Sequence, residues 1–459
     1  MVYFLYRNSP VFIQNLLCSL YGYLESRKRF NSDFFTLLLK FKESEWFNDS
    51  EILALKKEYL TRALISAKDS QLYPELNALE NHDIESSPFD VLSSLSYLKK
   101  DSLIEKISNS NFKPAAGSYK IMTSGTTGKA LILFKDKLSL SAQWAVWYRH
   151  RSRFDVQFKD LSVNFTGKPV VPIGQSKPPY WRFNSPQNQY LVSMQHINEN
   201  TIFDLVNFLN NIKPKFYSGY PSIISELARI ATQAGIKLDS DSRPNIVFTG
   251  AEKVLPYQKL SIESWTGVKL TDQYGLTEGS CNFSSCEFGN YHEDFEFCHI
   301  ELADEEFFSD GSSRGRLIGT AFYNSATPLI RYDTGDIATL APEGFRCPCG
   351  RNSRVILSVD GRIDDFILTP DGRQVMRLDY LFKDTDEVIE AQVIQEKENE
   401  IIILAVPSLS FNKDMFENKV KSHFIEYISD TMALVFSYTD SIPKGPNGKF
   451  KAVVNRIER

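Results

Sequence analysis

The segment Met122-Thr-Ser-Gly-Thr-Thr-Gly-Lys129 decides how the rest of this sequence is interpreted. It follows an apolar run at residues 119–122 that is typical of a strand. Glycines let backbone N–H groups close around an anion, hydroxyls donate to phosphate oxygens, and the lysine adds a mobile charge. The spacing of a Walker A loop is absent. We therefore predict a phosphate-binding loop, the alternative being an ordinary turn between strands, formed by Ser124, Gly125, Thr126, Thr127, Gly128 and Lys129.

The regions around this loop alternate short apolar runs with helical stretches. The runs after the loop's own strand lie at residues 131–134, 161–165, 246–248 and 268–270, and one helical stretch lies at 223–234. This alternation indicates an α/β fold of layered subdomains around a largely buried sheet. The first hundred residues are predicted to be mainly helical, since apolar residues between Ile52 and Ile65, including Leu53, share one broad face. Ser9 and Pro10 are predicted to cap and begin an amphipathic helix.

The C-terminal hundred residues have a different pattern, typical of a small α+β domain. Residues 387–395 and 400–406 predict a hairpin, 415–428 a helix and 434–438 a strand. We place the boundary at residues 358–362. Residues 1–360 are expected to form a large N-terminal domain, with a helical part at 1–100 and an α/β part at 101–360 that contains the predicted phosphate-binding loop. Residues 361–459 form a small, mobile lid.

Composition and charge exclude several classes of protein. The 459 residues are 42% hydrophobic and 24% charged, which indicates a globular chain. A net charge of −5 without a basic block argues against nucleic acid or an anionic membrane as the main partner. No apolar window is long enough to predict a transmembrane segment or a signal peptide. Six cysteines are too few for a disulfide scaffold, so we expect a cytoplasmic protein with free thiols or metal ligands.

Further blocks follow the loop in a fixed order. They are Thr249-Gly-Ala-Glu252, Tyr274-Gly-Leu-Thr-Glu278, Tyr332-Asp-Thr-Gly-Asp336, Gly361-Arg-Ile-Asp-Asp365 and Pro443-Lys-Gly-Pro-Asn-Gly-Lys449. With the loop, they resemble the adenylate-forming superfamily of acyl-CoA synthetases, peptide-synthetase adenylation domains and beetle luciferases. The Cys347-Pro-Cys-Gly-Arg351 segment is similar to that of the phenylacetate-CoA ligase branch and its capsule-biosynthesis members. The resemblance covers nearly the whole chain.

The resemblance implies a role for each block. Lys449 would stabilise the adenylation transition state, Thr277 would donate to the α-phosphate, and Glu278 would hold Mg²⁺. Asp336 would accept both ribose hydroxyls, because a carboxylate has two acceptor oxygens. Asp364 would act as the hinge of the lid. Besides the phosphate loop, the residues implied to bind ATP or AMP are Gly250, Ala251, Glu252, Gln273, Tyr274, Gly275, Asp336 and Arg362.

A set of cysteines and one histidine predicts a structural Zn²⁺ site. Cys286 and His292 lie just after the Tyr-Gly-Leu-Thr-Glu block, and Cys347 and Cys349 precede the hinge. Three thiolates and an imidazole suit tetrahedral Zn²⁺, and two clusters far apart in sequence are suited to joining loops. The alternative is a set of free cysteines around a turn. Other residues that could replace a ligand are Cys281, Cys298 and His299.

The predicted function is ATP-dependent activation of a small-molecule carboxylate to acyl-AMP, followed by transfer to an acceptor. The acceptor is an amine, of a sugar or an amino acid in surface-polysaccharide synthesis, or the thiol of CoA. An acyl-CoA ligase of the phenylacetate type and a degenerate nucleotide-binding protein are the alternatives. The acyl pocket is predicted at Phe165, Thr166, Tyr217, Gly219, Tyr220 and Pro221, with core packing as the alternative reading.

Overall fold

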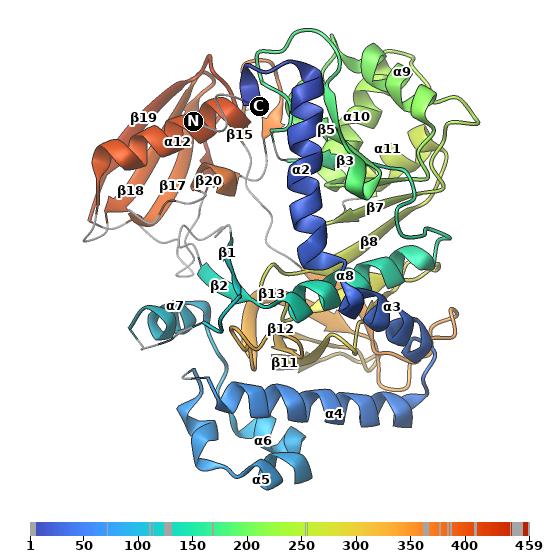
Figure 1. Ribbon diagram of the computed structural model, residues 1–459, viewed down its shortest axis with the longest axis vertical. Helices are drawn as coiled ribbons and strands as arrows, with labels where there is room; N and C mark the ends of the chain where they lie inside the picture. The colour runs from blue at the N-terminus through green and yellow to red at the C-terminus, as the bar shows by residue number, and fades with distance from the viewer. Residues whose placement is uncertain are drawn as a thin grey trace.

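The computed structural model shows a large mixed domain and a smaller C-terminal sheet with one long helix (Figure 1). It describes residues 6–70, 72–109, 112, 114–123, 131–167, 169–252, 254, 256–360, 367–375, 378–382, 385, 388–407, 411–440, 442 and 453–457. The α/β class with a smaller C-terminal unit, predicted from the sequence, is confirmed.

A 12-stranded sheet forms the centre of the large domain, in the order β11-β12-β13-β14-β10-β9-β8-β7-β6-β3-β5-β4. Its parallel part consists of β3 (Ser162–Thr166), β5 (Gln189–Ser193), β6 (Phe216–Gly219), β7 (Ile246–Gly250) and β8 (Leu270–Gly275). These strands are connected through α9 (Ile202–Ile212), α10 (Pro221–Gln233) and α11 (Pro256–Thr266). Strand β7 is buried at four successive residues, as expected for a parallel strand covered on both faces.

Antiparallel strands complete this sheet on both sides. They are β4 (Trp181–Asn184), β9 (Asn282–Ser285), β10 (Tyr291–Glu293), β11 (Cys298–Phe307), β12 (Ser313–Ala321), β13 (Tyr332–Leu340) and β14 (Val355–Asp360). Strand β13 alternates buried and more exposed side chains, which is typical of a strand with one face on the core. The ribose block therefore lies on an antiparallel strand of the large sheet.

The N-terminal helices are α2 (Val11–Arg29), α3 (Ser32–Ser44), α4 (Asp49–Lys68), α5 (Asn81–Ser86), α6 (Pro88–Ser94) and α7 (Lys100–Asn109). Two details of the prediction are wrong. Helix α2 begins at Val11 with Pro10 as its N-cap, so Ser9 does not cap it. Leu53 is 58% exposed, because the buried face of α4 is centred on Leu60 and Leu64. None of the described helices is long and apolar enough to cross a membrane.

The strands on either side of the phosphate loop form a ribbon of their own. β1 (Tyr119–Thr123) and β2 (Leu131–Lys135) pair with each other and do not join the 12-stranded sheet. Their apolar runs therefore belong to a separate ribbon and not to the buried sheet expected from the sequence. Helix α8 (Lys137–Ser152) follows directly, with Asp136 accepting the Ser139 N–H at its start. The loop between β1 and β2, residues 124–130, lies outside the described residues.

The C-terminal part has its own sheet and core. Strands β17 (Val388–Lys397) and β18 (Glu400–Pro407) form the predicted hairpin, with Lys397 opposite Glu400. β19 (Ala433–Tyr438) and β20 (Val453–Asn455) lie on its two edges, and β15 (Ile367–Leu368) pairs with β16 (Gln374–Val375). Helix α12 (Lys413–Tyr427) packs Phe416, Val420 and Phe424 against this sheet. This core contains residues between 367 and 453 and none of the large domain.

Candidate active site and metal-binding cluster

The ends of two neighbouring parallel strands bring the predicted adenine segment together. In β7 and β8, Gly250 lies opposite Gln273, and a Cβ on Gly250 would approach the Gln273 carbonyl oxygen to 3.0 Å. Ala251 then adopts a φ of 67°, which turns the chain sharply after the strand. Since parallel strands end at the same edge of a sheet, Ala251, Glu252 and Gln273 lie at one edge. This edge is where a doubly wound sheet places its ligand.

The predicted ribose carboxylate is held by a residue of another block. The Tyr274 hydroxyl donates to Asp336 Oδ2 over 2.7 Å, across from β8 to β13. Burial raises the pKa of Tyr274 well above its usual value, and the adjacent Asp336 charge raises it further. Tyr274 therefore remains a donor at neutral pH, and its ring stacks on Phe283 with centroids 5.1 Å apart. Asp336 is buried, which suits a carboxylate that accepts hydroxyls away from bulk water.

The turn that carries Thr277 and Glu278 rests on a buried lysine that the sequence reasoning missed. Lys135 lies on β2 with only 3% of its surface exposed, and its Nζ donates to Gln143 Oε1 over 3.0 Å. Gln143 in turn donates to the Leu276 carbonyl at 3.4 Å. A Cβ on Gly279 would fall 3.3 Å from Lys135 Nζ. Lys135 therefore lies directly beneath the turn at residues 276–279.

The charge of this lysine is affected by its surroundings. Burial lowers the pKa of Lys135 to about 8, while the nearby carboxylates of Glu278 and Asp136 counteract that shift. The sequence did contain a signal: Lys135 occupies the third inward position of a strand whose other inward residues are Leu131 and Leu133. A charged residue at an apolar position of a period-2 pattern has a structural or functional reason. Here the reason is its place under the turn at residues 276–279.

His150, which the sequence reasoning also missed, contacts side chains of strand β8. His150, on α8, is completely buried, with Nε2 3.0 Å from Thr271 Oγ1 and Nδ1 3.4 Å from Gln273 Oε1. Burial lowers its pKa well below 6.5, with Arg153 adding to the effect. His150 is therefore a neutral packing residue that orients Gln273 from behind.

Some predicted residues lie outside the described residues. These are the phosphate loop Ser124, Gly125, Thr126, Thr127, Gly128 and Lys129, together with Arg362, Asp364 and Lys449. Their roles stay predictions. The flanking strands β1 and β2 meet at Thr123 and Leu131, so both ends of the phosphate loop lie at one end of this ribbon.

The residues predicted to line the acyl pocket lie on two neighbouring strands and the helix after them. Phe165 on β3 and Tyr217 on β6 have almost no exposed surface and meet edge to face, with centroids 5.4 Å apart. Gly219 has no room for a side chain, because its Cβ would fall 2.7 Å from the Phe165 carbonyl oxygen. Tyr220 is the N-cap of α10 and Pro221 its first residue. Phe165 and Tyr217 are core residues here, and the acyl pocket stays a prediction.

Four ligand-type residues gather where the β9–β10 segment meets the loop between β13 and β14. The ligand atoms of Cys286, His292, Cys347 and Cys349 all lie within 4.8 Å of one another. Cys286 Sγ is 3.7 Å from Cys347 Sγ, and Cys349 Sγ is 3.3 Å from His292 Nε2. Tetrahedral Zn²⁺ with Zn–S and Zn–N bonds spaces its ligand atoms by roughly 3.5–3.8 Å. The four donors therefore fit this metal in type and spacing.

The three alternative metal ligands, Cys281, Cys298 and His299, lie outside this four-residue cluster. Cys281 faces Gly319, whose Cβ would meet its sulfur, and Cys298 contacts the Asn282 carbonyl. His299 packs against Phe89, with ring centroids 5.6 Å apart. None of the three belongs to the four-residue cluster among the described residues. The structure thus brings together the four predicted ligands and leaves out the three alternatives that sequence spacing allowed.

The surroundings of the cluster orient its histidine and favour its unprotonated form. His292 Nδ1 lies 3.2 Å from Ser353 Oγ, which leaves Nε2 facing the sulfurs. Burial lowers the pKa of His292 to about 4, and Arg153 and Arg351 add to the shift. Burial raises the pKa of the Cys286 thiol to about 11, whereas that of Cys347 is lowered because donors to its sulfur outweigh burial. A neutral imidazole that is fixed on its other nitrogen is the usual form of a metal ligand.

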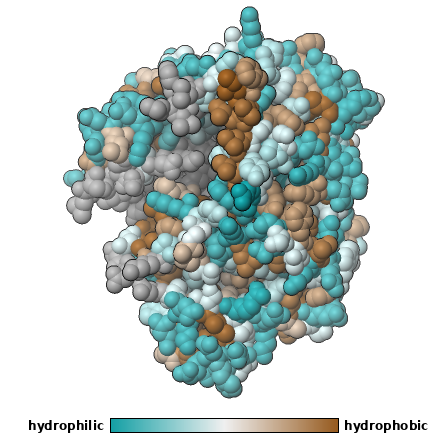
Figure 2. All heavy atoms as spheres, viewed as in Figure 1, coloured by the Kyte–Doolittle hydropathy of each residue, from teal (hydrophilic) through white to brown (hydrophobic). Residues whose placement is uncertain are grey.

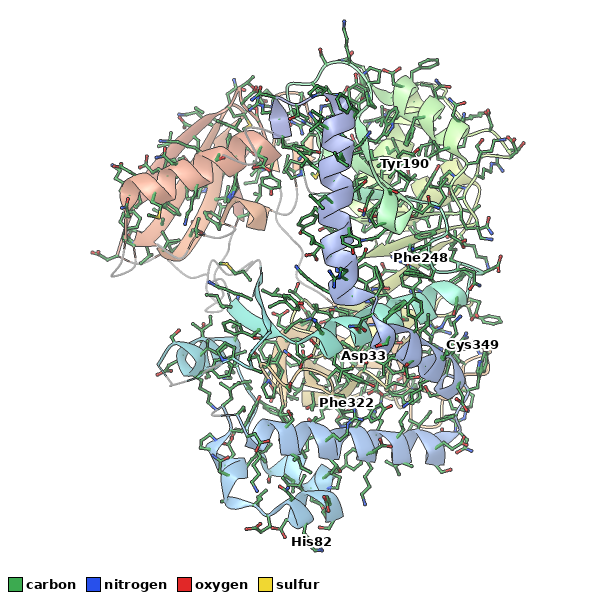
Figure 3. The ribbon with its side chains drawn as sticks, in the orientation of Figure 1. Asp33, His82, Tyr190, Phe248, Phe322 and Cys349 are labelled. Atoms are coloured by element: carbon green, nitrogen blue, oxygen red, sulfur yellow. The ribbon has the colours of Figure 1, made fainter. Side chains whose placement is uncertain are left out.

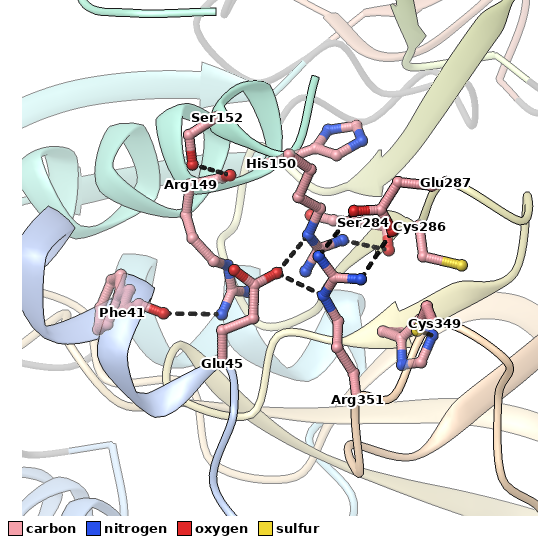
Figure 4. A network of polar contacts seen from close by, with 12 residues as sticks. Phe41, Glu45, Arg149, His150, Ser152, Ser284, Cys286, Glu287, Cys349 and Arg351 are labelled. Atoms are coloured by element: carbon pink, nitrogen blue, oxygen red, sulfur yellow. Dashed lines mark hydrogen bonds and ion pairs between the residues drawn. The ribbon is translucent and has the colours of Figure 1, made fainter. Parts of the chain in front are cut away.

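A network of buried charges joins this cluster to the N-terminal helices (Figure 4). Glu45 accepts from Arg153 at 2.5 Å and from Arg351 at 2.6 Å. Arg351 follows Cys349 by two residues, so the Glu45 carboxylate anchors the loop of Cys347 and Cys349 to the end of α3. Arg149 on α8 pairs with Asp294 and, over 2.7 Å, with Glu296. Cys349 lies on the side of the large domain away from the C-terminal sheet (Figure 3).

Comparison with known proteins shows which proteins this chain is similar to. The model of the CapK C-terminal domain matches residues 367–456. Over its full length the chain is 24% identical to protein CapK of Staphylococcus aureus, and all of both chains is covered. It is also 29% identical to phenylacetate-coenzyme A ligase of Thermus thermophilus over 36% of this chain and 37% of that one. The chain is thus similar over its whole length to CapK and in part to phenylacetate-coenzyme A ligases of the adenylate-forming superfamily.

A further relative and a solved structure extend the comparison. It is 31% identical to indoleacetate–lysine synthetase of Pseudomonas savastanoi over 30% of this chain and 32% of that one. The crystal structure of 2-hydroxyisobutyryl-CoA ligase with 2-HIB-AMP and CoA matches with a TM-score of 0.58. That match has 16% sequence identity and covers 90% of this chain and 91% of the other. It shows a common fold for both parts of the chain.

Proposed function

We propose that this protein is an ATP-dependent ligase that activates a carboxylate as its acyl-AMP and then transfers the acyl group. In the first step a carboxylate oxygen attacks the α-phosphate of ATP, and pyrophosphate leaves. In the second step the acceptor attacks the acyl carbon, and AMP leaves. The Tyr274–Asp336 hydrogen bond, with Asp336 buried, lies beside the turn of Thr277 and Glu278 and is the observation that carries the proposal, since it provides a ribose acceptor next to proposed phosphate-binding groups.

Each described residue of the candidate active site has a role in this scheme. Asp336 accepts the ribose hydroxyls, and Tyr274 holds the carboxylate in place. Gly250, Ala251 and Gln273 form the edge against which the adenine lies. Glu278 would hold Mg²⁺, which when bound would supply positive charge beside the phosphates. Lys135 fixes the turn that presents Thr277 and Glu278. Catalysis is then mainly positioning and placement of positive charge.

The acceptor defines two candidate activities. We propose an amine acceptor, of a sugar or an amino acid, because the relative indoleacetate–lysine synthetase is named for joining an acid to an amino acid. The second candidate is transfer to the thiol of CoA, which is supported by the phenylacetate-coenzyme A ligase relative. Both share the adenylation step, so the first test concerns that step. As a consumer of ATP, the protein is proposed to act in the cytoplasm.

We also propose that Cys286, His292, Cys347 and Cys349 bind structural Zn²⁺. Four protein donors fill a tetrahedron and leave no open position for substrate. The ion would tie the β9–β10 turn to the segment between β13 and β14, both of which continue from blocks of the nucleotide site.

The proposed activity is tested by pyrophosphate release over a panel of carboxylic and amino acids, each with ATP and Mg²⁺. The panel is repeated with CoA, with amino acids and with amino sugars to identify the acceptor. Release that depends on one acid is expected, and Lys449→Ala should reduce it by about 10²-fold or more while ATP binding persists. A wild-type rate in Lys449→Ala would reject the role of that lysine. ATP binding without pyrophosphate release over the panel would favour a degenerate nucleotide-binding protein.

A further inference from the structure

Helix α2 is attached to the protein through its polar side. Gln14 and Gly22 are its buried residues. Gln14 Oε1 accepts from Arg182 Nε over 2.7 Å, and Asn15 Oδ1 accepts the Phe183 N–H over 3.0 Å. Gly22 lies against Asn184, where a Cβ would fall 1.9 Å from the amide oxygen. Polar and small residues therefore dock this helix on the edge strand β4.

The opposite side of α2 is apolar and faces solvent. Phe12 is 71% exposed and Leu16 is 67% exposed, and Leu20 and Leu24 continue the same row at helical spacing. Figure 2 shows these residues as a continuous hydrophobic stripe along the position of α2 in Figure 1. A surface helix normally has the reverse arrangement, with its apolar stripe on the core. An exposed apolar stripe of this length is typical of an interaction surface.

The charged residues of α2 and of the segment before it are mostly positive. Between Tyr6 and Leu24 the sequence contains no carboxylate, Arg7 precedes the helix, and Arg27, Lys28 and Arg29 form its last turn. Glu25 accepts from Lys28 at 2.5 Å and from Arg29 at 2.6 Å, and the three basic residues still outnumber this one carboxylate. The helix is thus locally cationic in a chain whose net charge is −5. The overall charge, which argued against an anionic membrane, does not describe this surface.

This charge pattern distinguishes between two occupants of the stripe. If a second copy packed along α2 in the parallel sense, the basic last turns of both helices would meet. In the antiparallel sense, Arg7 of each copy would face the basic last turn of the other. Both pairings bring like charges together, at a cost that a dimer would have to overcome. An anionic lipid surface instead offers opposite charge to the ends and acyl chains to the middle.

We propose that α2 is a docking surface for an anionic lipid bilayer. The helix lies flat in the interface, with Phe12, Leu16, Leu20 and Leu24 among the acyl chains and the basic last turn at the headgroups. Tyr21 and Tyr23 flank the stripe, and tyrosine suits the depth at which apolar and polar regions of a bilayer meet. The large domain is thereby held at the membrane surface through β4. This surface is independent of the proposed adenylation chemistry.

The test is flotation of the purified full-length protein with phosphatidylcholine vesicles, with and without phosphatidylglycerol. The wild type is expected to float with the anionic vesicles and less so as salt is raised. Leu16→Ser/Leu20→Ser should reduce the bound fraction about tenfold or more, because two leucines that would insert among the acyl chains are lost. Arg27→Gln/Lys28→Gln should weaken binding and its salt dependence. Phe203→Ser/Leu260→Ser is the matched control, since these residues are 66% and 68% exposed on α9 and α11.

Melting temperature and pyrophosphate release in solution should be unchanged in the α2 variants, which shows that they fold. Failure of the wild type to float with anionic vesicles would overturn the proposal, as would equal flotation of wild type and Leu16→Ser/Leu20→Ser. Equal binding to neutral vesicles would overturn the role of the basic turn. A dimer in analytical ultracentrifugation that Leu16→Ser/Leu20→Ser dissociates would identify a second copy as the occupant and reject the lipid surface.

Discussion

The Tyr274 hydroxyl and the Asp336 carboxylate form a partly buried hydrogen bond of 2.7 Å that joins two residues 62 positions apart in the sequence. Because Asp336 is the proposed acceptor of both ribose hydroxyls, Asp336→Ala should lower the affinities for ATP and AMP by about 1.5–3 kcal/mol each. Tyr274→Phe keeps the carboxylate and should cost less. Calorimetric titration with AMP measures both. Asp333→Ala is the control, since Asp333 lies on the same strand as Asp336 and pairs with Arg316 of β12. Unchanged AMP affinity in Asp336→Ala would reject the ribose assignment.

The position of Lys135 leads to a second prediction. Lys135→Met removes the ammonium beneath the turn at residues 276–279 and keeps a side chain of similar length. Adenylation should slow about tenfold or more, because the groups on that turn lose their fixed position. AMP affinity should be retained, since it rests mainly on Asp336.

The readouts are pyrophosphate release and AMP titration. Lys137→Met is the matched control, because Lys137 is exposed two residues further along. Gln143→Leu should resemble Lys135→Met, since Gln143 links Lys135 to the Leu276 carbonyl. An adenylation rate equal to wild type in Lys135→Met would show that the lysine only fills space.

The cysteine and histidine cluster should contain about one zinc per chain by elemental analysis. Cys347→Ser and Cys349→Ser should lose the metal, melt earlier and lose ATP affinity only indirectly. Acidification should release the metal, because thiolates and a neutral His292 are required. Cys281→Ser and Cys298→Ser are the controls and should retain it. A zinc-free protein with unchanged melting would contradict the site, and loss of metal in either control would reassign its ligands.

His196 should make the fold sensitive to acid. Burial lowers its pKa to about 4 in the folded protein, below the value of about 6.5 in the unfolded chain. The unfolded state therefore binds the proton first, so this stability is fully present above pH 6.5 and is lost as the pH falls toward 4. The loss should be on the order of 1–3 kcal/mol over that window. His196 contacts Ser193 Oγ and the Gln175 carbonyl oxygen, at 2.9 and 3.1 Å.

Urea unfolding of wild type and His196→Asn, each at pH 7 and pH 5, measures this contribution. The difference between the two proteins isolates His196 from the pH dependence of the metal site. The free energy of unfolding should fall more in the wild type between the two pH values. An equal fall in both proteins would mean that His196 is not the group responsible.

Much of the site could be predicted from the sequence because its chemistry is local. The order of the blocks, the Asp336 carboxylate and the choice of four metal ligands depend on residue types and spacing, and the structure brings Cys286, His292, Cys347 and Cys349 together. The hairpin around Lys397 was predicted for the same reason, since alternation and a turn are properties of neighbouring residues. These features need no knowledge of what packs against them.

Only the tertiary structure decided which side of each element is buried. Sequence predicts α2 as amphipathic, but its polar side is docked because β4 offers Arg182 and exposed strand groups to pair with Gln14 and Asn15. Lys135 occupies an inward position because Gln143, Asp136 and Glu278 surround it. Burial of a polar group is favourable only where partners from distant segments satisfy it, and a linear pattern does not contain those partners. The sequence thus determined which residues are candidates for the proposed chemistry, and the fold determined which polar groups are buried with partners.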